Sequence, residues 1–545
     1  MSLREIATTP IAGQRPGTSG LRQKTRVFMR LHYLENFVQS VFDTVAETHE
    51  LGSATLVVGG DGRYHNREAL QTIVALAAAN GWKHVLVGRH GWLSTPAASA
   101  VIRGRGATGG LILSASHNPG GPEGDFGVKY NVDNGGPAPS AVTEAIYART
   151  ATLERYRTRD SVDVDLDTLA VVQLGTTRVE VIDPVTDYCA TLAELFDFDA
   201  LRAWFARGGT LAFDAMNAIT GPYGKHVFED LLGAGAGTVL RATPLPDFGG
   251  VHPDPNLVHA HDLVTRLQGA GAPDLGAASD GDGDRNMILG RDCFVSPGDS
   301  LALIAEHAQR CIPGYRTGLS GIARSMPTST AADRVAAALG VPLYETPTGW
   351  KFFGNLMDAG LCTLCGEESF GTGSNHVREK DGIWAVLCWL SILAHTNKSV
   401  AQLLHEHWER FGRSYYQRHD YEGLDTDAAQ SMYDDLRARL TSLVGSNWAG
   451  KVVVSAADFR YQDPVDGSVA ENQGIRIVLD DASRVVCRLS GTGTQGATLR
   501  VYLESVRADA LDQDPATVLT PLARATRALL DIESRCGRSA PSLVT

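Results

Sequence analysis

One structural unit recurs three times along the 545-residue chain, and this repetition limits the folds that the sequence can adopt. Each copy begins with an apolar strand, continues through a loop of small and polar residues into a helix that ends near glycine, and closes with another strand. The copies begin at Thr55, Thr210 and Gly318. They lie too far apart for a solenoid and therefore predict three α/β domains of one design, with mixed, mostly parallel sheets.

The pattern changes after about residue 412. Helical periodicity predicts helices at 425–444 and 515–531, and apolar runs predict strands at 451–455, 474–479, 484–489 and 498–503. Strands grouped between helices favour a smaller α+β domain on an antiparallel sheet. Near the N-terminus, one amphipathic helix with a core-facing stripe is predicted from Phe28, Leu31, Leu34, Phe37, Val38, Val41, Phe42 and Val45.

Composition narrows the class of protein. A hydrophobic fraction of 43% and a charged fraction of 20% are typical of a soluble globular chain. The net charge of −13 argues against nucleic acid or an anionic membrane as the main partner. The first 20 residues lack the apolar core of a signal peptide, and the apolar stretch 383–394 suits a buried helix and is too short to span a bilayer. The cysteines are scattered along the chain, which indicates a reducing compartment, and we expect the cytoplasm. Cys362 and Cys365 form a lone CxxC pair, which we interpret as two small apolar core residues.

A loop with candidate nucleophilic serines follows the apolar run 111–113. It begins Ser114-Ala115-Ser116-His117 and continues through glycine and proline to Lys129. Reactive groups are often displayed where a strand gives way to such a loop, although an ordinary surface turn has the same composition. An earlier loop, 15–24, combines Gly, Ser and Thr with two arginines and suits either a phosphate site or a flexible arm.

Three aspartates alternate with glycine at Asp280, Asp282 and Asp284. Glycine lets the loop curl so that three carboxylates converge on one hard cation. An EF-hand would require Glu at its twelfth position, where Arg291 stands, so an EF-hand calcium loop is rejected. An open site that takes a further phosphate oxygen suits Mg²⁺, and a solvated acidic turn is the alternative.

Three further segments carry polar groups suited to a sugar phosphate. Glu367 and Ser369, with Gly349 nearby, could contact hydroxyl groups, or could form a capping box for a following helix. The segment 378–382 adds Lys380 but by itself resembles a solvated charge run. Residues 488–500 join two predicted strands and form either an anion nest with an arginine at each end or an ordinary glycine-rich hairpin connection.

Together these motifs resemble the α-D-phosphohexomutase superfamily, most closely the phosphoglucomutases of the long, eukaryote-like type. The resemblance covers nearly the whole chain and includes the segments 247–250, 252–256 and 463–468. It implies four domains in a heart-shaped arrangement, with one loop from each meeting in a central cleft. We expect α/β domains at 1–183, 184–296 and 297–411, and the α+β domain at 412–545.

The resemblance also implies a role for each matching residue. Ser116 corresponds to the phosphorylated nucleophile, and one Mg²⁺ per chain would be bound by Asp280, Asp282, Asp284 and an oxygen of the phosphoserine. The catalytic set would further contain His117, Lys129, Arg22, Arg285 and Lys380. The substrate-binding set would contain Thr348, Gly349, Glu367, Ser369, Arg488, Ser490, Gly491, Thr492 and Arg500, the last five as a clamp for the phosphate that is not transferred.

Two positions depart from the family pattern. Ser114 stands where Thr is usual, which keeps the hydroxyl, and Thr494-Gln495 replaces a Ser-Ala pair. The implied activity is interconversion of α-D-glucose 1-phosphate and 6-phosphate, with glucose 1,6-bisphosphate as intermediate and activator and with closure of the last domain over the substrate. We expect a monomer or a homodimer. The alternatives are a phosphomannomutase, a hexose-bisphosphate synthase, or a catalytically silent relative, which the intact Ser116 and aspartates argue against.

Overall fold

The computed structural model describes residues 2–17, 19–160, 163–492 and 496–545. The chain divides into two compact units. The first unit comprises Met1–Val295, His307–Ser320 and Gly349–Val400, and the second comprises Ser296–Glu306, Gly321–Thr348 and Ala401–Thr545. Among the described residues, no helix has both the length and the apolar character that crossing a membrane requires.

The largest sheet of the first unit has the strand order β2-β6-β5-β3-β4-β9-β8. In chain order its strands are β2 (Leu21–Lys24), β3 (Thr55–Gly60), β4 (His84–Trp92), β5 (Gly109–Leu113), β6 (Asp125–Val132), β8 (Val171–Leu174) and β9 (Thr177–Ile182). Parallel pairs join β5, β3, β4 and β9 at the centre, and antiparallel pairs add β6 and β2 at one margin and β8 at the other. This is the mixed α/β sheet that the first repeat predicts.

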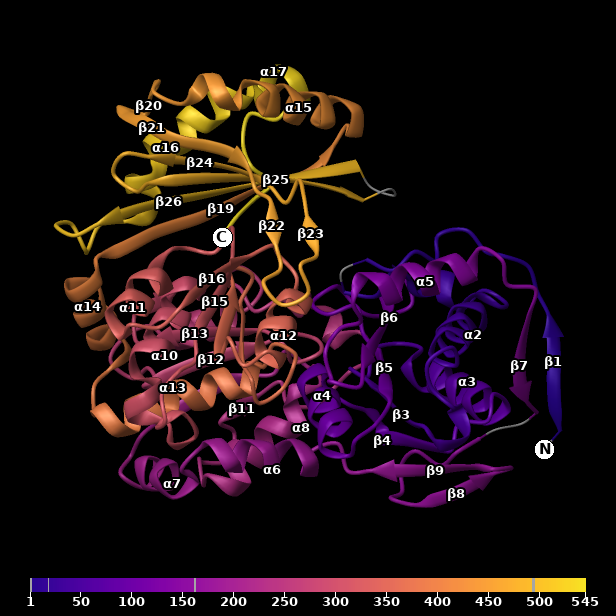
Figure 1. Ribbon diagram of the computed structural model, residues 1–545. Coiled ribbons are helices and arrows are strands. Elements are labelled where there is room, and N and C mark those ends of the chain that lie inside the picture. Colours follow the sequence, from indigo (N-terminus) through magenta and orange to yellow (C-terminus); the bar gives the residue numbers. More distant parts are fainter. Residues whose placement is uncertain (1, 18, 161–162, 493–495) are drawn as a thin grey trace. The chain divides into compact units, whose positions relative to one another are not determined.

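Helices cover both faces of this sheet. Figure 1 shows α2 (Tyr33–Val45) and α3 (Asn66–Ala79) on one side of β3 and β5 and α4 (Thr95–Gly104) on the other. The buried strand residues Leu56 and Val58 belong to the core cluster that contains α2 and α3. The remaining elements here are β1 (Leu3–Ala7), β7 (Arg155–Arg159) and α5 (Ser140–Thr150).

The prediction of one continuous helix from Phe28 to Val45 is wrong. A short α1 (Thr25–Phe28) ends first, and α2 begins at Tyr33 after His32, whose φ of 68° is left-handed. Leu31, predicted to face the core, is 77% exposed. Apolar residues can keep a helical spacing of 3.6 across a short loop by chance. The spacing alone therefore does not show where one helix ends and the next begins.

The second repeat forms a sheet in the order β11-β10-β12-β13-β14. Its strands are β10 (Leu211–Asp214), β11 (Val239–Leu240), β12 (Leu275–Ser279), β13 (Asn286–Gly290) and β14 (Cys293–Val295). β10 is parallel to β11 and β12, and β13 and β14 add antiparallel pairs, so the aspartate-rich loop is the connection from β12 to β13. The helical segments are α6 (Thr186–Leu195), α7 (Phe198–Ala206), α8 (Thr220–Gly224), a π-helix (Lys225–Leu231) and α9 (His261–Arg266).

The third repeat contributes to both units. In the first unit lie α12 (Trp350–Asp358), the antiparallel pair β17 (Leu364–Glu367) and β18 (Gly371–Ser374), and the buried α13 (Gly382–Thr396), which matches the predicted core helix. In the second unit β15 (Ile322–Ser325) pairs in parallel with β16 (Leu343–Thr346) beside α11 (Ala331–Leu339). Helices α10 (Pro297–Cys311) and α14 (Val400–Phe411) contribute residues to each unit.

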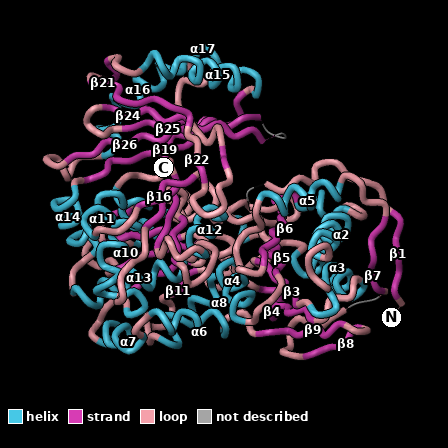
Figure 2. Tube along the Cα trace, in the orientation of Figure 1, coloured by secondary structure: helices cyan, strands magenta, loops and turns pink. Residues whose placement is uncertain are grey.

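The C-terminal sheet is antiparallel throughout its described pairs, as predicted. Its order is β20 (Asn447–Trp448), β21 (Lys451–Asp458), β24 (Ile475–Leu479), β25 (Arg484–Thr492), β26 (Gly496–Arg507), β19 (Arg413–Leu424) and β27 (Leu543–Val544). A small hairpin pairs β22 (Tyr461–Gln462) with β23 (Val469–Ala470). Figures 1 and 2 show α15 (Thr426–Leu443), α16 (Pro515–Leu530) and α17 (Ile532–Cys536) together over one face. Strand β19 was not predicted, because charged and polar residues interrupt its apolar positions.

Candidate active site

Ser116 lies just beyond the carboxyl end of β5, as the sequence predicts, in a left-handed conformation with φ of 54°. Two hydrogen bonds fix its backbone: the N–H donates to Ser114 Oγ over 2.7 Å, and the carbonyl accepts from Arg63 Nη2 over 2.8 Å. Left-handed conformations are uncommon for residues other than glycine and are kept where the surroundings impose them. The loop therefore presents the Ser116 hydroxyl in one defined position.

A buried ion pair behind the loop supports this conformation. Arg63 Nε donates to Asp61 Oδ2 over 2.9 Å, and neither side chain is exposed. Asp61 Oδ2 also accepts from Ser114 Oγ over 2.6 Å, and Arg63 Nη1 donates to the carbonyl of Asp125 over 2.7 Å. Sequence reasoning missed both residues as part of the site. The available signal was a pair of opposite charges in the glycine-rich loop that follows the first predicted strand.

Replacement of Arg63 by methionine is expected to lower the free energy of unfolding by about 3–5 kcal/mol, because it leaves the buried Asp61 carboxylate without its cation. Urea denaturation of the purified variant measures this loss. The control is Arg67→Met, which breaks the half-exposed ion pair with Asp167 and should cost about 0–1 kcal/mol. Equal losses in the two variants would contradict the supporting role of Arg63.

The three aspartates converge, as predicted. Single oxygens of Asp280, Asp282 and Asp284 lie within 4.8 Å of one another, and all three side chains are buried. Ser116 Oγ donates to Asp280 Oδ2 over 2.9 Å. Oδ1 of Asp282 and Oδ1 of Asp284 are buried without a hydrogen-bond partner among the described residues. Buried carboxylate oxygens without a partner suit a cation, so the donor set fits a hard divalent metal such as Mg²⁺, and the burial of all three side chains excludes a solvated turn.

Local geometry brings the serine and aspartate loops together. A Cβ atom added to Gly281 would lie 2.4 Å from the Ser116 carbonyl oxygen, so only glycine allows this approach. Burial, reinforced by Asp284 and Asp282, raises the pKa of Asp280 well above its ordinary value. Burial would also raise the pKa of Asp282, but the adjacent Lys129 ammonium holds it below the ordinary value. A bound cation would relieve the remaining repulsion.

Two predicted lysines flank the aspartates. Lys129 Nζ lies 2.5 Å from Asp282 Oδ2, and Lys380 Nζ lies 3.1 Å from Asp284 Oδ2. Burial alone would lower both pKa values, but Asp282 and Asp284 raise that of Lys129, and Asp284 and Glu367 raise that of Lys380. Both ammonium groups therefore stay charged at neutral pH.

His117 follows Ser116 in the chain, and its Nδ1 lies 3.4 Å from Ser116 Oγ. Burial, followed by the charges of Arg285 and Arg22, lowers the pKa of His117 well below its ordinary value, so the imidazole is neutral. Arg285 Nη1 lies 3.6 Å from Asp254 Oδ1, and its Nε lies 3.8 Å from Asp280 Oδ2.

The N-terminal loop contributes one of its two arginines. Arg22, on β2, has a buried Nε without a hydrogen-bond partner among the described residues, and burial lowers its pKa. Arg15 instead pairs with Glu144 at the surface, over 2.8 Å. The described residues of this loop are thus held by the Arg15–Glu144 pair and by the pairing of β2 with β6. Only Arg22 lies among the charges of the candidate site.

The predicted sugar-contact residues lie on the β17–β18 hairpin and beside it. Glu367, at the end of β17, accepts a hydrogen bond from the Gly349 N–H over 2.9 Å, and burial raises its pKa. Ser369 lies in the turn that follows. Because β18 follows this turn, the capping-box alternative is wrong. Thr348 precedes Gly349 and belongs to the second unit.

The segment 378–382 is not the solvated charge run that its composition suggests. Arg378, Glu379 and Asp381 are buried. Glu379 Oε1 accepts from Asn131 Nδ2 over 2.9 Å, and Asp381 caps α13 by accepting from the Trp384 N–H over 3.0 Å. These contacts hold Lys380 between two fixed neighbours.

The predicted clamp residues lie in the second unit, on the β25–β26 hairpin. Arg488, Ser490, Gly491 and Thr492 belong to β25 and Arg500 to β26, and Arg488 is directly opposite Arg500 in the register. Residues 493–495, which include Thr494 and Gln495, lie outside the described residues. β25 and β26 pair antiparallel on both sides of these residues, and the two opposed arginines form a candidate anion site.

In the first unit, the arrangement has the parts that phosphoryl transfer needs. A serine hydroxyl held in one position contacts one of three carboxylates suited to a divalent cation. Charged Lys129 and Lys380 and a neutral His117 surround it. Such transfer depends mainly on positioning and on neutralising charge.

Family models match the chain in succession. Models described as phosphoglucomutase/phosphomannomutase alpha/beta/alpha domains I, II and III match residues 13–157, 186–292 and 297–411. A model described as the phosphoglucomutase-1 C-terminal domain matches residues 413–542. Together these four matches extend over most of the chain.

Full-length relatives agree with the models. A phosphoglucomutase of Rhizobium radiobacter is 55% identical over 545 residues and covers 100% of both chains. A chloroplastic phosphoglucomutase of Arabidopsis thaliana is 50% identical over 558 residues, covering 100% of this chain and 89% of the relative. The open form of pp63/parafusin from Paramecium, described as an exocytosis-sensitive phosphoprotein and phosphoglucomutase, superposes with a TM-score of 0.92 at 47% identity, covering 100% of this chain and 99% of the other. On this similarity the chain belongs to the phosphoglucomutase/phosphomannomutase family.

Proposed function

We propose that the protein is a phosphoglucomutase, which interconverts α-D-glucose 1-phosphate and α-D-glucose 6-phosphate through a phosphorylated Ser116. The observation that carries this proposal is the contact of the Ser116 hydroxyl with Asp280 inside the aspartate cluster. A hydroxyl in that position, once phosphorylated, brings its phosphoryl group beside the metal site. The names and full-length identity of the relatives support glucose as the sugar.

Asp280, Asp282 and Asp284, with an oxygen of the phosphorylated Ser116, would hold one Mg²⁺ per chain. When bound, the ion neutralises charge on the oxygens of the transferring phosphoryl group. The chain's own cations share this task. Lys129 and Lys380 are charged and fixed on Asp282 and Asp284, so their positive charge is in place before the substrate arrives.

In the first half-reaction the Ser116 O–P bond breaks while a P–O bond forms to the free hydroxyl of glucose 1-phosphate, which loses its proton. Ser116 Oγ, the leaving oxygen, takes up a proton in exchange, so the protons balance. His117 lies beside this leaving oxygen and is suited to hydrogen-bond the serine hydroxyl that forms. Arg22 and Arg285 hold the transferring oxygens, and Glu367, Ser369, Thr348 and Gly349 contact the sugar. The product, glucose 1,6-bisphosphate, reorients so that its other phosphate faces Ser116 and is transferred to it. The bisphosphate therefore serves as both intermediate and activator.

Arg488, Ser490, Gly491, Thr492 and Arg500 would bind the phosphate that is not being transferred. Two opposed arginines on neighbouring strands support this role. A clamp of this kind accepts either phosphate of the bisphosphate, and closure of the last domain would keep water from the phosphoserine.

We also propose that the four domains span residues 1–183, 184–296, 297–411 and 412–545, a division supported by the ranges of the family models. A cytoplasmic location is supported by the eight cysteines, all of which lie in the described part of the chain as free thiols. Because one relative is chloroplastic, the location of this protein is tested by cell fractionation. We propose a monomer or homodimer that binds no nucleic acid or membrane, in line with the net charge of −13.

The test of the proposed function is turnover by the purified protein with Mg²⁺ and a trace of glucose 1,6-bisphosphate. Formation of glucose 6-phosphate from glucose 1-phosphate is followed with a coupled dehydrogenase, and mannose 1-phosphate is assayed in parallel. We expect the glucose substrate to have the higher kcat/KM. A preference for mannose would favour a phosphomannomutase, and no turnover of either sugar would indicate a silent relative.

A further inference from the structure

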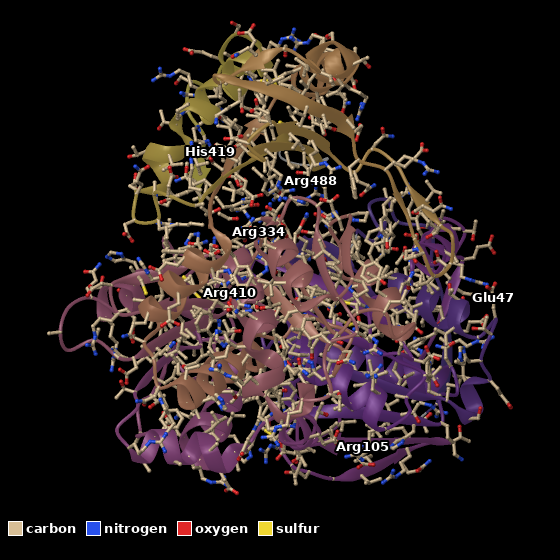
Figure 3. The ribbon with its side chains drawn as sticks, turned by 60° about the vertical axis from the view of Figure 1, so that its left-hand side comes forward. Glu47, Arg105, Arg334, Arg410, His419 and Arg488 are labelled. Carbon is tan, nitrogen blue, oxygen red and sulfur yellow. The ribbon has the colours of Figure 1, made fainter. Side chains whose placement is uncertain are left out.

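The C-terminal sheet has two chemically different faces. On β26, Leu499, Val501 and Leu503 belong to the core cluster that also contains buried residues of α15 and α16. His419 of β19, labelled in Figure 3, lies on this helix-covered face, and its pKa is lowered by burial and by Arg527 of α16. The residues between these positions point to the opposite face. That face carries Arg488, which is also labelled in Figure 3.

Three charged residues form a row across neighbouring strands of this opposite face. The register places Asp420 of β19 directly opposite Arg500 of β26, and Arg500 directly opposite Arg488 of β25. Directly opposed side chains on one face of an antiparallel pair lie close together, and two like charges in that position destabilise the pair. We call Asp420, Arg500 and Arg488 the charged row. Its carboxylate stands at one end, beside the central arginine.

Within the charged row, the Asp420 side chain is buried and the Arg500 side chain is exposed. Its side chain is 3% exposed, whereas that of Arg500 is 40% exposed. Asp420 Oδ2 lies 3.8 Å from Arg500 Nε, and Oδ1 lies 2.9 Å from Arg418 Nε on the same face. The carboxylate thus meets the Nε edge of Arg500 and leaves the terminal nitrogens of the guanidinium for an anion.

The backbone of Asp420 is held from both sides. β26 pairs with it on one side, and Leu543 of β27 is its register partner on the other. The Ser542 N–H donates to the Asp420 carbonyl over 2.7 Å. On the far side of the row, Gly474 gives the Arg488 stem its room, since a Cβ there would lie 2.9 Å from Arg488 Cγ. The row is therefore built on fixed strands.

Opposite charges alternate around Asp420. Arg418 and Arg500 lie beside its carboxylate, and Glu422 adds a further negative charge that acts on it. Removal of the Asp420 carboxylate would free the Nε edge of Arg500, so the guanidinium would lose the contact that fixes its orientation.

We propose that Asp420 is a positioning residue of the phosphate clamp, which orients the Arg500 guanidinium toward a bound phosphate. This inference rests on the proposed clamp function of Arg488 and Arg500. Asp420 does not touch the substrate and acts through Arg500.

A double-mutant cycle tests this proposal. KM and kcat for glucose 1-phosphate are measured for the wild type, Asp420→Asn, Arg500→Ala and the double variant. We expect Asp420→Asn to raise KM about tenfold with a much smaller change in kcat, and to add less than about twofold in the Arg500→Ala background. Arg500→Ala alone should raise KM at least as much as Asp420→Asn.

The matched control is Glu504→Gln. Glu504 is a buried carboxylate on the same face of β26, and its Oε2 accepts from Arg484 Nε of the opposite strand over 2.6 Å. Its replacement should lower the melting temperature and leave KM unchanged. Asp420→Ser is a second, smaller uncharged variant in case the asparagine variant does not fold, and thermal unfolding identifies folded samples.

The possible failures are distinguishable. If Asp420→Asn and Asp420→Ser both leave KM unchanged, or raise it equally in the Arg500→Ala background, the positioning role is overturned while the clamp stands. If Arg500→Ala itself leaves KM unchanged, the clamp is overturned together with the role of Asp420. A rise in KM for Glu504→Gln would show that any lost ion pair on this face acts similarly, and would also overturn the inference.

Discussion

Turnover of glucose 1-phosphate is expected to fall by a factor on the order of 10⁴ or more when Ser116 is replaced by alanine. Alanine removes the oxygen that carries the phosphoryl group, and the site offers no other hydroxyl that contacts Asp280 in the described part of the chain. A coupled assay of glucose 6-phosphate formation measures the loss. Intact-mass analysis should show one phosphate on the wild type and none on the variant.

The fold should survive this substitution. The backbone contacts that hold the loop, from Ser114 Oγ and Arg63 Nη2, do not involve the Ser116 side chain. The control is Ser391→Ala, which removes another buried serine hydroxyl. That hydroxyl donates to the Leu387 carbonyl within α13 and has no part in the proposed mechanism. Turnover similar to the wild type in Ser116→Ala would end its proposed role as phosphate carrier, whatever the result for Ser391→Ala.

Asp282→Asn is expected to weaken Mg²⁺ binding about 100-fold and to lower turnover at a fixed Mg²⁺ concentration by a similar factor. The substitution keeps the volume but removes one anionic oxygen from the cluster and the charge that fixes Lys129. Calorimetric titration with Mg²⁺ reads the metal affinity without reference to turnover. High Mg²⁺ should restore part of the activity.

A matched control exists in the neighbouring strand. Asp214, at the end of β10, is buried and pairs with Arg241, but it is not part of the aspartate cluster. Asp214→Asn should lower stability through the lost ion pair and leave Mg²⁺ affinity unchanged. Unchanged Mg²⁺ affinity in Asp282→Asn, or an equal loss in both variants, would contradict the proposed metal site.

Much of the fold follows from local patterns. The repeated unit predicts the α/β domains, and the grouped strands predict the antiparallel C-terminal sheet, because apolar periodicity reports which face of an element is buried. The same logic fails where periodicity crosses a turn, as between α1 and α2, and where a strand carries alternating charges on an open face, as in β19. In both places burial is decided by packing rather than by the local pattern.

The candidate site divides in the same way. Ser116 and the three aspartates could be predicted, because each motif is identified within a few residues by its glycine spacing and by the apolar strand that precedes it. Asp61 and Arg63 could not, since their part is to support a loop that is distant in sequence. Segment 378–382 is a further case, because its charges are buried only by partners such as Asn131 and Asp284.

By itself the sequence determined the class of each domain, the residue types at the candidate active site and the spacing that lets the three carboxylates converge. Only the tertiary structure decided that Arg63 holds Ser116 in a left-handed conformation, that Lys129 and Lys380 are held charged by buried aspartates, and that Asp420 faces Arg500 across a strand pair. The physical reason is range. Backbone preference and periodicity act over neighbouring residues, whereas charge pairing and burial depend on which distant segments are brought into contact.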